Sequence, residues 1–177
     1  ITLNMAAGAN GEGGGLLQHN PGTLTVARTL FEFNSSPSGH GGGLHLLGTS
    51  ALIEDSYIRQ NSAQSGGGIT SYTALTVRRS TLANNAANQF TGGGAAIDQR
   101  HQALVLQNST LSGNQGAYGA LRVLADVTPA QVTHSTIAFN TGINGAGLTV
   151  GTAAVVFMQS NIVAQNAASA GNANCAV

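Results

Sequence analysis

The chain has 177 residues, enough for one domain, and only 7% of them are charged, against roughly 25% in an average soluble domain. Six basic and six acidic side chains give a formal net charge of zero, so we expect no nucleic acid partner, because binding to phosphates needs a positive field. No stretch approaches the roughly 20 apolar residues of a membrane span.

Internal repeats dominate the sequence. Six apolar residues, spaced 24 to 29 residues apart, form what we call the core column: Phe31, Ile58, Leu82, Leu111, Ile137 and Ile162. Five residues earlier stand Val26, Ile53, Val77, Leu106, Val132 and Phe157, and two before those stand Leu24, Ala51, Leu75, Leu104, Ala130 and Val155. These three apolar columns predict that the chain consists of stacked repeats.

Asparagine follows the core column at a spacing of three residues. The members are Asn34, Asn61, Asn85, Asn114 and Asn140, and the sixth repeat has Asn166 one position late. We expect each side chain to lie in a tight inward turn and to hydrogen-bond to its equivalent, or to backbone, in the next coil. The alternative is a ladder that contacts a ligand or ice.

The spacing of apolar residues within a repeat is typical of strands, and the glycine runs supply turns between them. One such repeat cannot bury its own apolar row, whereas stacked copies can. We therefore predict an all-β, single-domain, right-handed parallel β-helix of about six coils, with roughly 26 residues and three short strands per coil. Residues 1–12 would form a partial first coil, residues 13–166 the six coils, and residues 167–177 a small polar tail.

The titratable residues form no recognisable catalytic or metal-binding pattern. Glycosidases need two carboxyl groups at a set separation, and of the acids only Glu54 and Asp55 are neighbours, on opposite faces of a strand. One presumed loop with Asp98, Arg100 and His101 could hold a small site. The five histidines fall at different repeat positions. We expect no catalytic, cofactor or metal residues. Exposed charges should instead alternate in sign across coils, with Asp55 between Arg28 and Arg79 in one row and Glu54 beside Arg78.

Cys175 is the only cysteine. It could be a free thiol, a cross-link to another molecule, or half of a disulfide whose other half lies outside these residues.

Several motifs resemble a known family. Residues 31–34 (F-x-x-N) and the glycine strings at 66–69 and 92–97 resemble repeats of chlamydial polymorphic outer membrane proteins. They are more similar to bacterial secreted CSLREA-domain and choice-of-anchor proteins, whose coils end in a segment like residues 160–166 followed by a cysteine, here Cys175. The resemblance implies a β-helix exported to the bacterial cell surface, with adhesion or surface-layer roles. It also favours a disulfide at Cys175, because that environment is oxidising.

These observations predict a non-enzymatic extracellular structural protein, a stalk or filament subunit with an adhesin-like role and no cofactor. We expect it to self-associate end to end through the solenoid termini and to meet a surface glycan or another cell-surface partner. The alternative is a carbohydrate-binding or polysaccharide-cleaving, pectate-lyase-like β-helix. Ice binding ranks third, because the outward row between the two earlier apolar columns is not a regular threonine ladder. Its members are Thr25, Leu52, Thr76, Val105, Gln131 and Val156.

Overall fold

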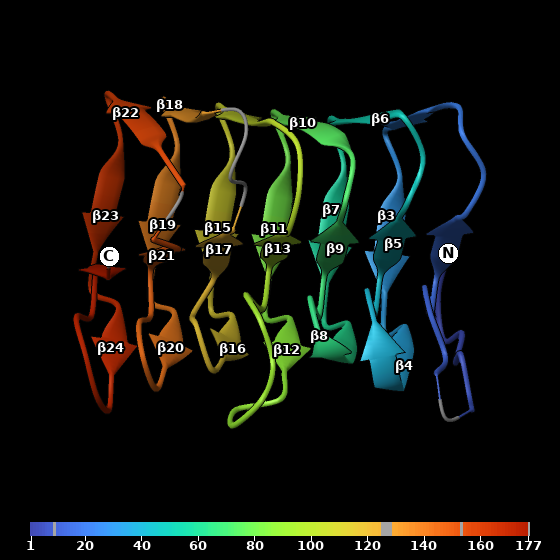
Figure 1. Ribbon diagram of the computed structural model, residues 1–177, viewed down its shortest axis with the longest axis horizontal. Helices are drawn as coiled ribbons and strands as arrows, with labels where there is room; N and C mark the ends of the chain where they lie inside the picture. The colour runs from blue at the N-terminus through green and yellow to red at the C-terminus, as the bar shows by residue number, and fades with distance from the viewer. Residues whose placement is uncertain (9, 125–128, 153, 177) are drawn as a thin grey trace.

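The computed structural model describes residues 1–8, 10–124, 129–152 and 154–176, and all regular structure in them is β-strand. The chain forms a parallel β-solenoid of about six coils, with about 26 residues per coil. Figure 1 shows the coils side by side, from the N-terminal coil at one end to the C-terminal coil at the other. Each coil contributes four strands, one more than the sequence predicted. The described residues include no helix long and apolar enough to cross a membrane.

Four sheets run along the stack, and all their strand pairs are parallel; we number the sheets by the order of their strands within a coil. Sheet 1 contains β1 (Leu16–Gln18), β5 (Leu44–Leu46), β9 (Ile69–Ser71), β13 (Ile97–Gln99), β17 (Leu121–Val123), β21 (Leu148–Val150) and β25 (Cys175–Ala176). Sheet 2 contains β2 (Thr23–Ala27), β6 (Ser50–Glu54), β10 (Ala74–Arg78), β14 (Leu104–Gln107), β18 (Ala130–Thr133) and β22 (Val156–Gln159).

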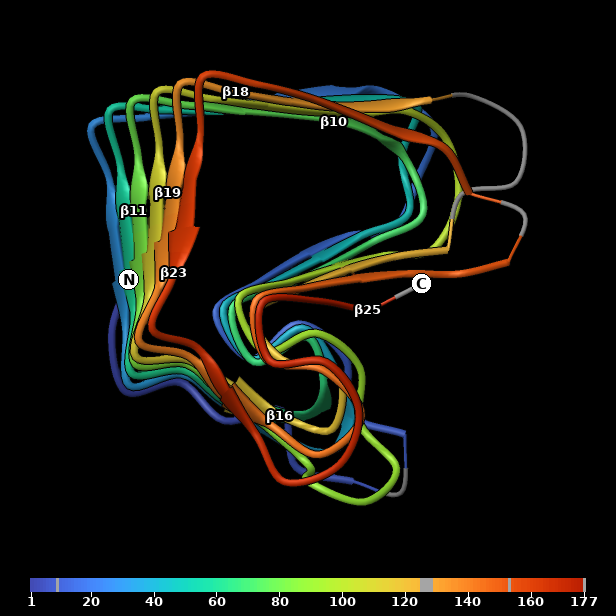
Figure 2. The same ribbon diagram turned by 90° about the vertical axis from the view of Figure 1, so that its left-hand side faces the viewer.

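The other two sheets have six strands each. Sheet 3 contains β3 (Leu30–Glu32), β7 (Tyr57–Arg59), β11 (Thr81–Ala83), β15 (Thr110–Ser112), β19 (Thr136–Ala138) and β23 (Ile162–Ala164). Sheet 4 contains β4 (Ser35–His40), β8 (Ser62–Ser65), β12 (Ala86–Ala87), β16 (Gln115–Gly116), β20 (Thr141–Gly142) and β24 (Ala167–Ala168). Viewed along the axis, sheets 1, 2 and 3 enclose one lobe, and sheet 4 with its loops forms a second (Figure 2).

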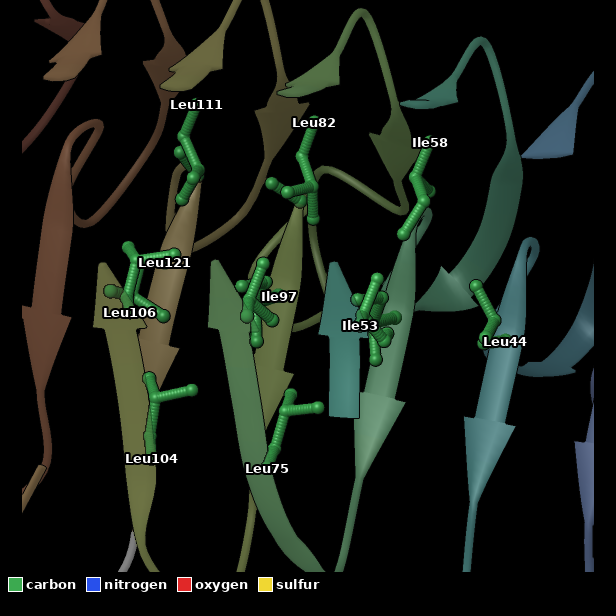
Figure 3. Close-up of a cluster of buried hydrophobic side chains, with 14 of the residues drawn as sticks. Leu44, Ile53, Ile58, Leu75, Leu82, Ile97, Leu104, Leu106, Leu111 and Leu121 are labelled. Carbon is green, nitrogen blue, oxygen red and sulfur yellow. The ribbon is translucent and has the colours of Figure 1, made fainter. Parts of the chain in front are cut away.

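The apolar core lies between sheets 1, 2 and 3. Side chains from the three sheets meet there at every level, as Figure 3 shows for Ile97, Leu106 and Leu111 among others. The first five members of the core column are fully buried: Phe31, Ile58, Leu82, Leu111 and Ile137. Burying one such side chain contributes roughly 1.5–3 kcal/mol, so stacking the coils supplies most of the driving force for folding.

Two corners of each coil are made by single residues in the left-handed backbone region. The residue between sheets 2 and 3 has φ of 47° to 55° in all six coils: Arg28, Asp55, Arg79, Asn108, His134 and Ser160. The residue between sheets 3 and 4 has φ of 54° to 66°: Phe33, Gln60, Asn84, Gly113, Phe139 and Gln165. Glycine serves the corner between sheets 4 and 1, where Gly41 has φ of 64° and a Cβ on Gly42 would lie 2.4 Å from the Ser62 carbonyl oxygen.

The sixth coil corrects the alignment made from the sequence. Ile162, assigned to the core column, is 60% exposed, and Phe157 and Val155 also face outward. The register pairs Ile137 with Val163, one residue further on. Residues 154–158 are all apolar, so the apolar pattern is satisfied whichever alternate set of side chains points inward. The outward row considered for ice binding likewise ends in Phe157 and not in Val156, because the register pairs Gln131 with Phe157.

The two ends of the chain also join the sheets. At the start, Thr2 bridges Glu32 and Met5 bridges Ser35, as expected for part of a coil. At the other end, β24 and β25 pair with β20 and β21. Residues 167–176, predicted as a polar tail, therefore continue the winding of the sixth coil.

Candidate functional site

The asparagine column forms a continuous ladder inside the solenoid. From Asn34 to Asn140, the backbone N–H and the Nδ2 group of each asparagine both donate to Oδ1 of the asparagine in the next coil, at 2.9–3.1 Å. Nδ2 also donates to a core-column carbonyl one coil back, such as Asn85 to Ile58 at 2.9 Å. The six predicted members Asn34, Asn61, Asn85, Asn114, Asn140 and Asn166 are all buried. The carboxamide groups of these asparagines therefore hydrogen-bond from coil to coil and hold the coils in register.

Two further asparagines extend this ladder and were missed by sequence reasoning. Asn4 donates to Oδ1 of Asn34 at 2.9 Å, and Asn166 donates to Oδ1 of Asn174 at 3.1 Å. Asn4 could have been found, because it follows Ile1 by the same three residues that separate Phe31 from Asn34. Asn174 follows Asn166 by only eight residues, and no repeat spacing indicates it.

A second ladder lies at the corner between sheets 2 and 3. The backbone N–H of each member donates to the side-chain oxygen of the member in the next coil, at 2.9–3.2 Å. The members are Thr29, Ser56, Ser80, Ser109, Ser135 and Asn161. Each follows a left-handed corner residue, as each ladder asparagine does. A serine or threonine recurs at this position in the first five repeats and was the available signal, but the ladder was not predicted.

Asp98 is fully buried on the face of sheet 1 that points away from the apolar core, and together with Arg100 and Arg122 it forms what we call the ion cluster. Nε of Arg122 lies 2.6 Å from Asp98 Oδ1, and Nε of Arg100 lies 2.8 Å from Asp98 Oδ2. Ser65 donates to Oδ2 at 2.8 Å, and Arg100 also donates to the Tyr72 hydroxyl at 3.1 Å. Burial opposes ionisation of Asp98, but its bonds to Arg122 and the nearby Arg100 outweigh burial and hold its pKa below the usual range.

The ion cluster occupies a column that the repeats define. Register pairs place Leu17, His45, Thr70, Asp98, Arg122 and Thr149 in one row across sheet 1. Each residue directly follows the apolar residue that comes after the glycines. The sequence grouped Asp98, Arg100 and His101, and the structure brings Asp98 to Arg100, but it adds Arg122 from the next coil.

His45 is buried two coils from Asp98 in the same row, with 1% of its surface exposed. Its Nδ1 lies 3.3 Å from Oε2 of Glu12, and its ring packs against His40 and Tyr72 at centroid distances of 5.6 and 5.8 Å. Burial lowers the pKa of His45 to about 4, because an imidazolium ion would lose its hydration there. The ring of His101 also packs against Tyr72, at a centroid distance of 5.5 Å. Within the described residues, no group of three or more His, Cys, Asp or Glu side chains could hold a metal ion.

The remaining ion pairs lie on the surface. Arg79 makes two bonds of 2.8 Å to the carboxylate of Asp55, and Arg78 lies 2.7 Å from Glu54, so these two predicted cross-coil pairs form. The ion pairs of the described residues include none between Arg28 and Asp55, which the sequence also predicted. Hydrogen bonds from these arginines lower the pKa of both Glu54 and Asp55. Cys175 is an exposed free thiol in the structure, and partial burial raises its pKa.

The fold and its two ladders define a parallel β-solenoid whose polar interior joins one coil to the next. Comparison with protein families gives the particular class: the family described as "Right handed beta helix region" matches residues 14–176. The chain belongs to this right-handed β-helix family. No curated protein and no solved structure matches it.

Proposed function

We propose that this protein is a non-enzymatic, extracellular structural protein of a bacterial surface, with an adhesin-like role. The observation that supports this most is the use of the interior polar groups. Two hydrogen-bonded ladders and four sheets pass through all the coils, which suits a rod whose task is to span a distance. The resemblance to secreted repeat proteins supports the surface location.

The state of the acidic residues argues against catalysis. A general acid at neutral pH needs a raised pKa, whereas Glu54, Asp55 and Asp98 all have lowered pKa values because arginines bind them. The Asp98 carboxylate is also completely buried, out of reach of a polymer. Asp126 lies outside the described residues. We expect no release of reducing ends from neutral or acidic polysaccharides, and turnover that copurifies with the protein would contradict this part of the proposal.

End-to-end self-association is the second part of the proposal. The last coil ends in the edge strands β22, β23 and β24, each paired on one side only within the described residues. Exposed apolar side chains lie on these strands, including Phe157 and Ile162, each 60% exposed. Unpaired edges of this kind favour pairing with another chain, and a head-to-tail contact that does not close produces filaments.

Light scattering and electron microscopy across a concentration series test the association. We expect rods that lengthen with concentration, and we expect Ile162→Lys to shorten them because a charge on an edge strand opposes pairing. Tyr57→Lys is the matched control, since Tyr57 lies in the same outward row, is 57% exposed, and belongs to a central strand. A wild-type protein that stays monomeric throughout, or equal loss in both variants, would contradict end-to-end stacking.

A further inference from the structure

The residue directly before each strand of sheet 1 belongs to what we call the glycine column. Register across sheet 1 aligns its members in consecutive coils: Gly15, Gly43, Gly68, Ala96, Ala120, Gly147 and Asn174. A Cβ added to Gly43 would lie 3.4 Å from Nδ2 of Asn61, and a Cβ added to Gly147 would lie 2.9 Å from Nδ2 of Asn166. In these coils the ladder asparagine therefore fills the space into which a longer side chain of this column would extend.

Asn174 is the member of the column that carries a carboxamide. The Leu148 N–H donates to its carbonyl at 2.9 Å, which holds its backbone in sheet 1, one level beyond β21. Its Oδ1 accepts the N–H and Nδ2 groups of Asn166 at 3.4 and 3.1 Å. Asn140 makes the same two bonds to Asn166, at 3.0 and 2.9 Å. Asn174 therefore occupies, from sheet 1, the position that the ladder asparagine of the next coil would take (the next ladder position).

Asn174 is held there less firmly than the asparagines inside the ladder. Its two bonds with Asn166 are longer than those between Asn140 and Asn166. Asn174 is also exposed, whereas Asn166 is 7% exposed. Water competes for exposed hydrogen bonds, so their net contribution is small. An asparagine with better geometry can therefore displace the Asn174 side chain.

Asn4 of a second copy is suited to displace it. Thr2 and Met5 already bridge sheets 3 and 4 of their own first coil. If a second copy continues the sheets, its residues 1–5 lie on β23 and β24, and its Asn4 reaches the next ladder position. Within the described residues the Asn4 side chain only donates hydrogen bonds, so its Oδ1 is left to accept from Asn166. Two carboxamides cannot fill one close-packed position.

We propose that Asn174 is an autoinhibitory cap: it closes the asparagine ladder, and a second copy stacks only when its Asn4 displaces the Asn174 side chain. The inference rests on the proposed end-to-end association and supplies its regulation. The edge strands favour stacking, and the cap opposes it, so rods form only at concentrations high enough to overcome the cap.

The first test compares the association of Asn174→Gly and the wild type by light scattering across a concentration series. Glycine restores the residue typical of the column and empties the next ladder position. Rods should form at about tenfold lower concentration, because two competing hydrogen bonds no longer have to be broken. Asn172→Gly is the matched control, since Asn172 is exposed two residues earlier and lies outside the ladder. Adding Asn4→Ala to Asn174→Gly should cancel the gain, because the incoming acceptor is lost.

The second test examines the cap without association. Amide hydrogen exchange of dilute, monomeric ¹⁵N-labelled protein is followed by NMR. The Asn166 N–H should exchange about tenfold faster in Asn174→Gly than in the wild type and Asn172→Gly, because it loses its acceptor. The Asn114 N–H, which donates to Asn140 inside the ladder, should exchange at the same rate in all three proteins.

Two results would overturn the cap. Equal exchange of the Asn166 N–H in Asn174→Gly and the wild type would show that Asn174 does not hold the next ladder position. Rods that form at the same concentration in both would show that it does not oppose stacking, while the stacking itself would stand. If both proteins stay monomeric at every concentration, the end-to-end association is refuted, and the regulatory role of Asn174 with it.

Discussion

The asparagine ladder and the ion cluster around Asp98 are both buried and polar, but they are built from different groups and extend over different lengths. The ladder repeats one neutral carboxamide from Asn4 to Asn174, and each rung meets the same partners. The ion cluster combines one carboxylate with two guanidinium groups from two neighbouring coils. A neutral group can be repeated at every coil, whereas like charges stacked at this distance would repel each other. Among the described residues, Asp98 is the one buried acidic side chain, and arginines of opposite charge lie against it.

Asn85→Asp should cause the largest loss of stability. The new carboxylate could accept from Asn61 but could not donate to the Ile58 carbonyl or to Asn114, which Asn85 does now. A buried charge without compensation costs about 4 kcal/mol, which urea unfolding at pH 7 would measure. Asn84→Asp is the matched control: Asn84 is exposed one residue earlier, and its change should stay within about 0.5 kcal/mol. Similar losses in both variants would show that the ladder position has no special role.

Asp98→Asn should have the next largest effect, about 3 kcal/mol, because two partly buried guanidinium groups would lose the fully buried charge that compensates them. Asp55→Asn is the control, since Asp55 also binds an arginine through both oxygens but lies on the surface. Unfolding in low and high salt sharpens the comparison. Salt screens exposed ion pairs strongly and buried ion pairs much less. The effect of Asp98→Asn should therefore persist in high salt. A loss that disappears in salt would contradict burial of the cluster.

Stability should also depend on pH through His45. Its pKa in the folded protein is about 4, below the usual 6.5, so the unfolded chain binds the proton first as pH falls. Stability should therefore fall between pH 6.5 and 4, by about 2 kcal/mol once solvent screening is allowed for. The groups facing His45 are Glu12, His40, Tyr72 and Arg100.

Urea unfolding at a series of pH values would measure this effect, and His45→Gln should remove it. Asp98 titrates in a different window: its lowered pKa means that its contribution is lost only below pH 3.8. A slope between pH 6.5 and 4 that survives in His45→Gln would assign the effect to another group.

The sequence predicted the repeating parts of the molecule, because repetition averages over many copies. Five core-column residues and six of the ladder asparagines were visible from spacing alone. The sixth coil was misaligned because its apolar run has no polar residue to set the strand phase; counting back from Asn166 would have selected Val163. The ion cluster was found only in part, because each of its members occurs once. Its signal was the position directly after the apolar residue that follows the glycines of each repeat, which places Asp98 beside Arg122.

The ladder also gives the solenoid a polarity. Every rung accepts hydrogen bonds from the coil before it and donates to the coil after it. Reversing one copy against another would bring donors to donors or acceptors to acceptors, so a joint that continues the ladder must keep all copies pointing the same way. A fibre built in this manner would have two chemically different tips, which could grow at different rates and present different surfaces to the cell and to its surroundings.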